Sequence, residues 1–438
     1  MDLNVQELSS SEKEIEITLK YEEVKNDIEA EVKKQSKKIQ IPGFRKGKVP
    51  AIVLKKRFGD SLEYEASEKI ANQHFWKIAD KESLNPIGQP KMIDLKFEPG
   101  KDLKFKVIYD IIPKIYVKDY TEQKIEIPNF IVKDSEVEKE IKHILHSNKI
   151  LEEAELVGSD NNYLLDVQLY RLNKDGEPEN DNGDKIQIDL TNEGVNKNII
   201  ENAKGKKAGD FFTFGFDDER TIKNDKNEDE KIKEHFDYKV QINKIKKIIL
   251  PELNEEFIKK VTKDKVSNEE DLKKEIRKDI QNYYDRKDEE ILKGKLINTI
   301  IKNNDFTPPT TMVNNIVEHL VKNEEEYLKK QRIPIPSHQE LEERFTSTAQ
   351  NDVKWYLLKT EILKKENITI TDDELKELAK KEAEKTGISS EKLLNYYKNS
   401  SQNEKLLDQK LFDFLKEKNN IVKLDPEKLI KREIKEKQ

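Results

Sequence analysis

Residues 37–58 read KKIQIPGFRKGKVPAIVLKKRF, and this stretch decides how the first part of the chain folds. Pro42 and Gly43 stop a helix that arrives from the N-terminal side, because proline lacks an N–H donor and glycine weakens a helix. Pro50 can open a new helix, since the first helical N–H has no partner within the helix in any case. The stretch therefore predicts a stiff loop between two helices, with Gly43 and Gly47 shaping its tip.

Two helices and two strands around this loop are predicted from apolar spacing. Apolar residues recur every four positions over residues 24–32, and a second helical pattern runs over 52–76. Residues 13–20 alternate polar and apolar side chains, and residues 103–112 (LKFKVIYDII) also read as a strand. These segments predict that residues 1–112 form a small α+β domain in which the two strands pair.

The middle of the chain combines an extended segment, one helix and a β-rich domain. Residues 113–133 look extended and partly linker-like, and residues 134–148 carry an apolar helical stripe. Two-fold alternation then returns in four segments separated by polar turns, which predicts a compact β-rich domain over residues 151–247. The four segments are 163–172, 185–190, 210–216 and 236–245.

The C-terminal part, residues 248–438, is predicted to be almost wholly helical. Ser267 with Glu270 and Thr371 with Glu374 have the spacing of capping boxes, which mark two helix starts. The first of these helices should run to the proline-rich stop DFTPPT. Further helices are expected at 310–331, 339–365, 371–386, 390–398 and 403–418.

The fold class that follows is α+β and multidomain. It has an N-terminal α+β domain (1–112), a linker and helix (113–150), a β-rich middle domain (151–247) and an all-helical C-terminal domain (248–438). The length of 438 residues agrees with several separate cores. Charged residues make up 39% and hydrophobic residues 34%, so order depends on the periodic placement of the apolar side chains.

Composition excludes several classes of function. The chain has no cysteine, which excludes disulfides, thiol catalysis and cysteine-based zinc sites and fits a reducing compartment. Its start is charged, and no apolar run approaches the roughly 20 residues that span a bilayer, so we expect a soluble, cytoplasmic protein without membrane contact. We identify no phosphate-binding glycine loop and no Ser/His/Asp arrangement, so we expect no nucleotide and no other cofactor.

The charge of the loop differs from that of the whole chain. Between Lys33 and Gly59 the sequence has ten cations and no acid, although the net formal charge of the chain is −7. A basic tip on an acidic body attracts polyphosphates. Phe44 can stack on a base or enter a partner's pocket, and Arg45 can bind phosphate through two N–H groups, with Lys46 as a mobile point charge. The alternative is a solvated charge run in which Phe44 folds back on its own hairpin.

The octapeptide GFRKGKVP resembles, without a gap, the ribosome-docking signature of bacterial trigger factor. Other segments resemble that family in the same order over nearly the whole chain, and they include NPIGQP, LPELNEEFIKKV, TMVNNIVEHLV, ITDDELKELAKKEAEKTG and LLDQKLFDFLKEK. The resemblance implies an ATP-independent chaperone that docks at the exit tunnel of the large ribosomal subunit and holds nascent polypeptides during folding and export. It implies contacts with a ribosomal protein and rRNA through Gly43, Phe44, Arg45 and Lys46, with Gly47 and Lys48 of the same signature.

The same resemblance implies that the helical C-terminal region, with the segment 113–150 packed into it, forms the arms and body of a cradle. It also implies a homodimer away from the ribosome. One C-terminal helix carries an apolar stripe that is a candidate surface for nascent and unfolded chains, through Met312, Val313, Ile316 and Leu320. The alternative is that this stripe packs one helix against another, and the amphipathic pattern does not separate the two uses.

In trigger factor the middle domain is an FKBP-like prolyl isomerase, and such a site needs an apolar pocket with aromatic walls. Here Val167 and Ile199 stand where the two pocket phenylalanines are expected, and the loop that usually bears a tyrosine reads DDERTI. Tyr238 and either Phe212 or Phe214 are the remaining candidates for aromatic walls, although all three fit a strand core equally well. We therefore expect a degenerate site with weak or absent activity. The alternative is an active peptidyl-prolyl cis-trans isomerase that acts on newly made chains.

Two further hypotheses stay open. His143 and His146 lie three positions apart on one predicted helix, with Glu140 a turn before, and this spacing could hold a metal ion. Without a further ligand in view we expect a solvated helix face and no metal. For the whole chain, the remaining alternative is a free-standing RNA-binding or assembly protein that uses the basic loop on some other RNA.

Overall fold

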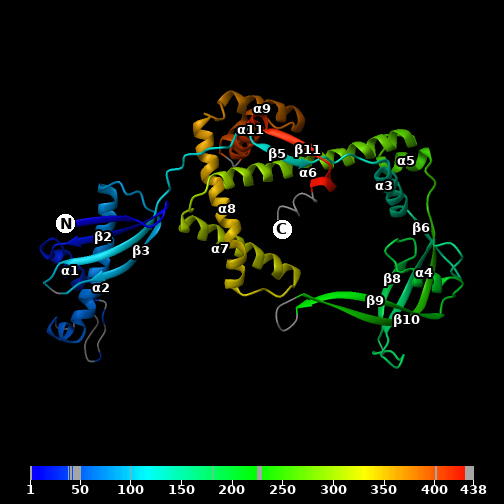
Figure 1. Cartoon of the computed structure of the whole chain (residues 1–438), viewed down its shortest axis with the longest axis horizontal. Helices are drawn as coiled ribbons and strands as arrows, with labels where there is room; N and C mark the ends of the chain where they lie inside the picture. The colour runs from blue at the N-terminus through cyan, green and yellow to red at the C-terminus, as the bar shows by residue number, and fades with distance from the viewer. Residues whose placement is uncertain are drawn as a thin grey trace. The chain divides into compact units, whose positions relative to one another are not determined.

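The structure is a computed structural model of the whole chain, shown in Figure 1. It describes residues 2–37, 39, 42, 51–98, 100–180, 182–223, 229–399 and 402–429, without the side chains of 51, 54, 55, 220–223, 229–232 and 399. Contacts divide the chain into two compact units, Met1–Asn129 with Asp288–Gln438 and Phe130–Lys287. No helix among the described residues is both long and apolar enough to cross a membrane.

The N-terminal part of the first unit is a four-stranded antiparallel sheet with strand order β1-β2-β4-β3, and two helices pack on it (Figure 1). Alternate residues of the central strands, such as Ile15 and Phe105, are buried against these helices. The predicted pairing of residues 13–20 with 103–112 is confirmed. The elements are β1 (Asp2–Glu7), β2 (Glu12–Leu19), α1 (Tyr21–Ser36), α2 (Ala51–Lys81), β3 (Ile87–Lys96) and β4 (Leu103–Asp110).

The two outer strands of this sheet are not evident in the sequence. Among the described strands β1 pairs with β2 alone, and its residues are mostly exposed, including Val5. The pairing of β3 with β4 shifts register after Ile87 and again after Met92. β1 alternates at only two apolar positions, Leu3 and Val5, and the register shifts interrupt the apolar spacing of β3, so neither segment shows the sustained alternation that marks a half-buried strand.

The helical part of the first unit contains the second half of α6 (Glu269–Asn303), α7 (Thr310–Gln331), α8 (His338–Lys365), α9 (Asp372–Thr386), α10 (Ser390–Asn399) and α11 (Gln402–Lys418). Its central core joins α6, α8 and α11 through apolar residues such as Leu296, Leu358 and Leu411. A short parallel pair, β5 (Lys124–Pro128) with β11 (Asn420–Leu424), packs on the same core. These helices match the ranges expected from the sequence.

One of the two predicted helix caps is confirmed and the other is displaced. The Thr371 side chain and Glu374 form the expected capping box at the start of α9. At the start of α6, however, the cap is Asn268 and not Ser267, because the Asn268 carboxamide oxygen accepts a 2.9 Å hydrogen bond from the Asp271 N–H. Adjacent serine and asparagine are both good caps, so the spacing alone could not choose between them.

The second unit contains a sheet of strand order β6-β10-β7-β8, with β9 paired along the other part of β10. Each of the four predicted strand segments lies inside a strand of this sheet to within one residue. A second cluster packs α3 against α5 and α6 through residues such as Val137, Ile258 and Ile276. The elements are α3 (Asp134–Ser147), β6 (Ile150–Glu153), β7 (Tyr163–Arg171), β8 (Asp184–Asp189), α4 (Lys197–Ala203), β9 (Phe211–Lys223), β10 (Asp229–Ile249) and α5 (Glu255–Thr262).

The segment 113–150 divides between the two units. Val117, Tyr120 and β5 pack on the helical core of the first unit. α3 packs in the second unit, where Arg277 forms an ion pair with Asp134. The expected packing with the C-terminal part therefore applies to both halves, but each half packs on a different portion of the helices.

Candidate functional site

The six signature residues from Gly43 to Lys48 lie outside the described residues, but the two helices that lead to them are described. α1 ends at Ser36 and α2 begins at Ala51, as the helix–loop–helix prediction requires. Lys69 on α2 donates a 2.6 Å hydrogen bond to Glu31 on α1, and this bond holds the pKa of the Glu31 carboxyl below its usual range. The loop is thus carried by two helices that are joined to each other.

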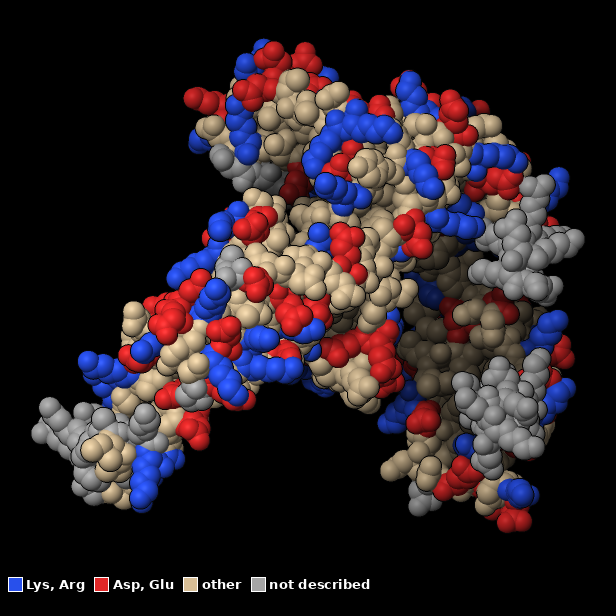
Figure 2. Space-filling model, turned by 60° about the vertical axis from the view of Figure 1, so that its left-hand side comes forward, with Lys and Arg blue, Asp and Glu red and all other residues tan. Residues whose placement is uncertain are grey.

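Five exposed cations surround the ends of these helices and are called here the basic rim: Lys33, Lys34, Lys37, Lys56 and Arg57. Lys34 is near enough to Glu31 on the same helix to help hold the pKa of that carboxyl below its usual range. Elsewhere the charges are mixed, and Figure 2 shows Lys and Arg interspersed with Asp and Glu over much of the face it presents. Exposed cations gathered close to the signature favour an acidic or phosphate-bearing partner.

The candidate pocket residues of the middle domain come together in one apolar cluster. Val167 on β7, Ile199 on α4 and Phe212 on β9 are 1%, 9% and 6% exposed. Tyr238 on β10 packs against the same cluster and stays partly exposed. The sequence prediction therefore identifies neighbouring residues, and three of the four serve as core.

An aromatic ladder on β9 and β10 extends this cluster, and sequence reasoning identified only part of it. Phe214 lies opposite Tyr238 with ring centroids 5.6 Å apart, and Phe216 lies opposite Phe236 at 5.7 Å. The guanidinium of Arg171 lies 4.8 Å from the centroid of the Phe236 ring. The ladder could have been predicted from the aromatic residues at alternate positions of the two strands, because such residues lie on one face of a hairpin.

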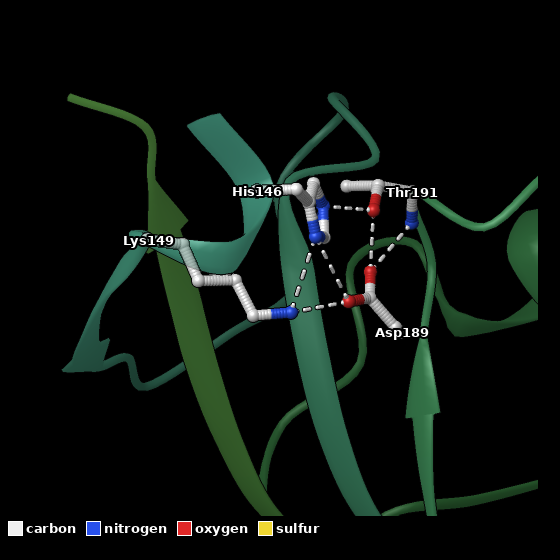
Figure 3. A network of polar contacts seen from close by, with 4 residues as sticks. All are labelled: His146, Lys149, Asp189 and Thr191. Carbon is white, nitrogen blue, oxygen red and sulfur yellow. Dashed lines mark hydrogen bonds and ion pairs between the residues drawn. The ribbon is translucent and has the colours of Figure 1, made fainter. Parts of the chain in front are cut away.

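His146 belongs to a polar network at the end of α3 (Figure 3). Its Nε2 lies 2.6 Å from the Thr191 hydroxyl, which donates a 2.5 Å hydrogen bond to Asp189. Lys149 donates a 2.6 Å hydrogen bond to the other carboxylate oxygen of Asp189. Burial by itself would raise the pKa of Asp189, but the hydrogen bonds from Lys149 and Thr191 keep it below its usual range. The network joins α3 to the end of β8.

The two histidines of the metal hypothesis have different surroundings. His143 is largely exposed and lies 3.8 Å from Glu140, whereas His146 faces Thr191. Among the described residues no cluster of three potential ligands could hold a metal ion. His146, one of the two histidines with metal-ligand spacing in the sequence, forms a hydrogen bond with Thr191 of the same unit.

The apolar stripe of α7 packs mainly on α8. Val313 is buried, and Met312 and Ile316 lie half-buried against the same cluster. Leu320 is also half-buried. This placement favours the alternative use of the stripe in helix packing, with only its margins open to solvent.

A more exposed apolar group lies where α7 ends. Tyr327, Ile333 and Ile335 are 55%, 49% and 47% exposed. The last two belong to the connection RIPIPS between α7 and α8, which the sequence analysis passed over. Apolar residues next to prolines in this connection could have indicated the group in the sequence. A surface connection does not need apolar side chains for packing, so their presence suggests a binding role.

Comparison with known proteins gives consistent results. Two family profiles match the chain: Bacterial trigger factor protein (TF) over residues 1–144, and Bacterial trigger factor protein (TF) C-terminus over residues 270–417. Together they cover about two thirds of the chain and leave residues 145–269 between them.

Curated relatives agree over a longer range. The trigger factor of Chlorobaculum parvum is 28% identical over 399 residues, and the match covers 91% of each chain. The trigger factor of Syntrophotalea carbinolica is 26% identical over 405 residues, covering 91% of this chain and 90% of the relative. A solved structure from work on promiscuous substrate recognition by the trigger factor chaperone has 19% identity and a TM-score of 0.47, and it covers 95% of this chain and 99% of its own.

Proposed function

The chain belongs to the trigger factor family of ribosome-associated chaperones, and from that premise we propose how its parts carry out this role. The domain of residues 1–112 docks on the large ribosomal subunit beside the exit tunnel. The helical part within 248–438 holds emerging polypeptides without ATP, and residues 151–247 form an FKBP-like domain with a degenerate site. The work takes place in the cytoplasm, and copies away from the ribosome pair as homodimers.

The observation that carries the docking role is the ungapped signature GFRKGKVP on a loop between two joined helices. Phe44 supplies an apolar side chain that fills a pocket on the ribosomal protein, and Arg45 and Lys46 bind carboxylate or phosphate groups. Gly43 and Gly47 let the backbone approach the ribosome closely. The basic rim adds long-range attraction to rRNA, since phosphates dominate its field.

Unfolded client polypeptides bind to small apolar areas of the helical part, which are surrounded by charged residues. Met312, Ile316 and Leu320 contribute the open margins of the α7 stripe, whereas Val313 serves the core between α7 and α8. Tyr327, Ile333 and Ile335 add the exposed group at the end of α7. Apolar contact stabilises by about 25 cal/mol per Å² before the costs of association are subtracted, so small separate areas bind weakly and release easily.

The middle domain is assigned a second client-contacting surface in place of isomerase activity. Catalysis of prolyl isomerisation needs an open apolar pocket around the twisted amide. Val167, Ile199 and Phe212 fill the interior, which leaves Tyr238 as the partly exposed member of the four. Isomerisation of a short proline peptide measures this directly, and a rate far above background would refute the assignment.

Cosedimentation with ribosomes tests the docking role. Changing Phe44, Arg45 and Lys46 together to alanine should weaken ribosome binding by about 100-fold or more, because buried aromatic and arginine anchors dominate interfaces. The matched control changes Tyr283, Arg286 and Lys287 to alanine, an aromatic and two cations on exposed positions of α6. Equal binding of the triple variant and the native chain would overturn the docking assignment.

A further inference from the structure

An open groove lies between the end of α1 and the first turns of α2. Its volume is about 440 Å³, and it is lined by Gln35, Ile39, Phe58, Ser61, Leu62 and Glu65. We call it the α1–α2 groove. Since α1 ends at Ser36 and α2 begins at Ala51, the groove lies at the base of the signature loop.

The groove has an apolar floor that the described residues leave uncovered. Leu62 is buried at the bottom, and Phe58 keeps 40% of its surface exposed at the side. Ile39 is half-buried. Ile52, at the start of α2, is 82% exposed and adds a second open apolar side chain near the same helix end. Apolar side chains placed together in a concave surface are typical of a site that receives an apolar group.

One polar atom in the groove also lacks a partner. Gln35 Oε1 is shielded from solvent, yet it accepts no hydrogen bond from any residue that the structure describes. Buried acceptors are nearly always paired in native proteins. A bound group with an N–H donor, such as the backbone of a peptide, would satisfy this oxygen.

The charge around the groove selects an acidic partner. The five cations of the basic rim lie on the same two helix ends, and Lys34 is near enough to Glu31 to help lower the pKa of that carboxyl. The acids on the same parts of the two helices are Glu29 and Glu31 on α1, with Glu31 paired to Lys69, and Asp60, Glu63 and Glu65 on α2. None of them lies between Lys33 and Gly59, a stretch with ten cations and no acid, so the charge on the loop side of the groove would attract carboxylates on the opposing surface.

We propose that the α1–α2 groove is a second ribosome contact, which receives one apolar side chain from an acidic segment of a ribosomal protein. The inference rests on the proposed docking function and adds a partner of stated chemistry to it. A protein segment fits better than RNA, because the apolar lining consists of Ile39, Phe58 and Leu62 and the unpaired acceptor requires an N–H donor. The rim cations then pair with the carboxylates of that segment.

Filling the groove tests this proposal in the full-length chain. Ser61→Trp places a large ring in the groove from an exposed position of α2, and ribosome affinity by cosedimentation should fall about tenfold. Gln73→Trp is the matched control, since it adds the same side chain to an exposed position of the same helix outside the groove, and it should stay within about twofold.

A second pair of variants, at Phe58, keeps the proposal testable if Ser61→Trp does not fold. Phe58→Ser removes the apolar wall and should weaken binding about fivefold, whereas Phe58→Leu retains an apolar wall and should stay within about twofold of the native chain. Native binding by both Ser61→Trp and Phe58→Ser would overturn the proposal. If the Phe44, Arg45 and Lys46 triple variant fails to bind in the same assay, the docking function stands and only the groove assignment fails.

Two other results would assign the groove to another occupant and so overturn the proposal. One is that Ser61→Trp weakens binding to protein-free rRNA as strongly as binding to whole ribosomes. The other is that Ser61→Trp leaves ribosome binding unchanged but shifts the monomer–dimer equilibrium of the free chain in sedimentation. If neither occurs and ribosome affinity falls as expected, a ribosomal protein is the occupant.

Discussion

In the middle domain Val167 and Ile199 are 1% and 9% exposed, whereas at the base of the signature loop Phe58 keeps 40% of its surface exposed. Both regions have apolar residues beside aromatic ones, so composition alone does not distinguish them. In the first region aliphatic side chains fill the interior of one buried apolar cluster. In the second an apolar floor stays open and is surrounded by cations. The difference predicts that recognition in this chain depends on apolar surface left open among charges.

The largest effect is expected when aromatic rings are introduced into the buried cluster of the middle domain. Val167→Phe with Ile199→Phe restores the ring positions that the family resemblance implies. Because both sites are buried, each larger side chain should destabilise the middle domain by about 1–3 kcal/mol. Hydrogen exchange of β7 would show the loss of protection.

The same double variant also tests whether the closed site is only dormant. We expect prolyl isomerisation to stay near background, since the added rings meet a packed interior. A gain of about 100-fold, equal to some 2.7 kcal/mol of barrier, would show that two substitutions separate a core from a catalytic pocket.

A smaller effect is expected from the network that joins α3 to β8. Asp189→Asn removes the charge that binds Lys149 and should weaken this contact by about 1–2 kcal/mol. Both tryptophans, Trp76 and Trp355, lie in the first unit, so their fluorescence does not report on this change. Hydrogen exchange of α3 does, with Asp184→Asn, an exposed position at the other end of β8, as the control.

The pH dependence of the same contact has a definite sign. The pKa of Asp189 is lower in the folded chain than the roughly 3.9 of an unfolded aspartate. Its contribution to stability is therefore complete above that value and is lost as the pH falls through the lowered folded pKa. Protection of α3 should decrease below about pH 4 in the native chain relative to Asp189→Asn. Parallel curves for the two chains would contradict this account.

The smallest effect is expected at the open apolar group of the helical part. Ile333→Ser with Ile335→Ser should raise the dissociation constant for an unfolded client about threefold, since small areas contribute little each. Ile93→Ser, at a similarly exposed position on β3, is the control. Fluorescence anisotropy with a labelled unfolded protein measures both. A loss of more than about 30-fold would mean that this group is a dominant anchor, unlike the weak contacts assigned to it.

Much of the fold could be predicted because its apolar residues are strictly periodic. The pairing of β2 with β4 follows from alternation on both strands, and the bounds of α7 follow from Pro309 before it and a stripe that ends near Gln331. β1 and β3 were not predicted, because the alternation of Leu3 and Val5 is too short to stand out and the register shifts of β3 interrupt its apolar spacing.

The candidate sites were less predictable for a different physical reason. A helical stripe such as Met312, Val313 and Ile316 predicts that one face is covered, but the identity of the cover depends on a neighbour far away in sequence. The α1–α2 groove depends likewise on how two helices approach each other. His146 shows the same limit, since its partner Thr191 lies 45 positions along the chain.

The pairing of β5 with β11 has a consequence for how the protein itself is made. Asn419 donates a hydrogen bond to the Tyr120 carbonyl across 299 positions, and β11 follows it directly. The N-terminal sheet needs only residues up to Asp110, so it can fold early in translation. The strand pair cannot close until nearly the whole polypeptide has left the tunnel, because contacts between distant residues form only when both are present. A chain that shelters others during synthesis therefore completes its own helical body last.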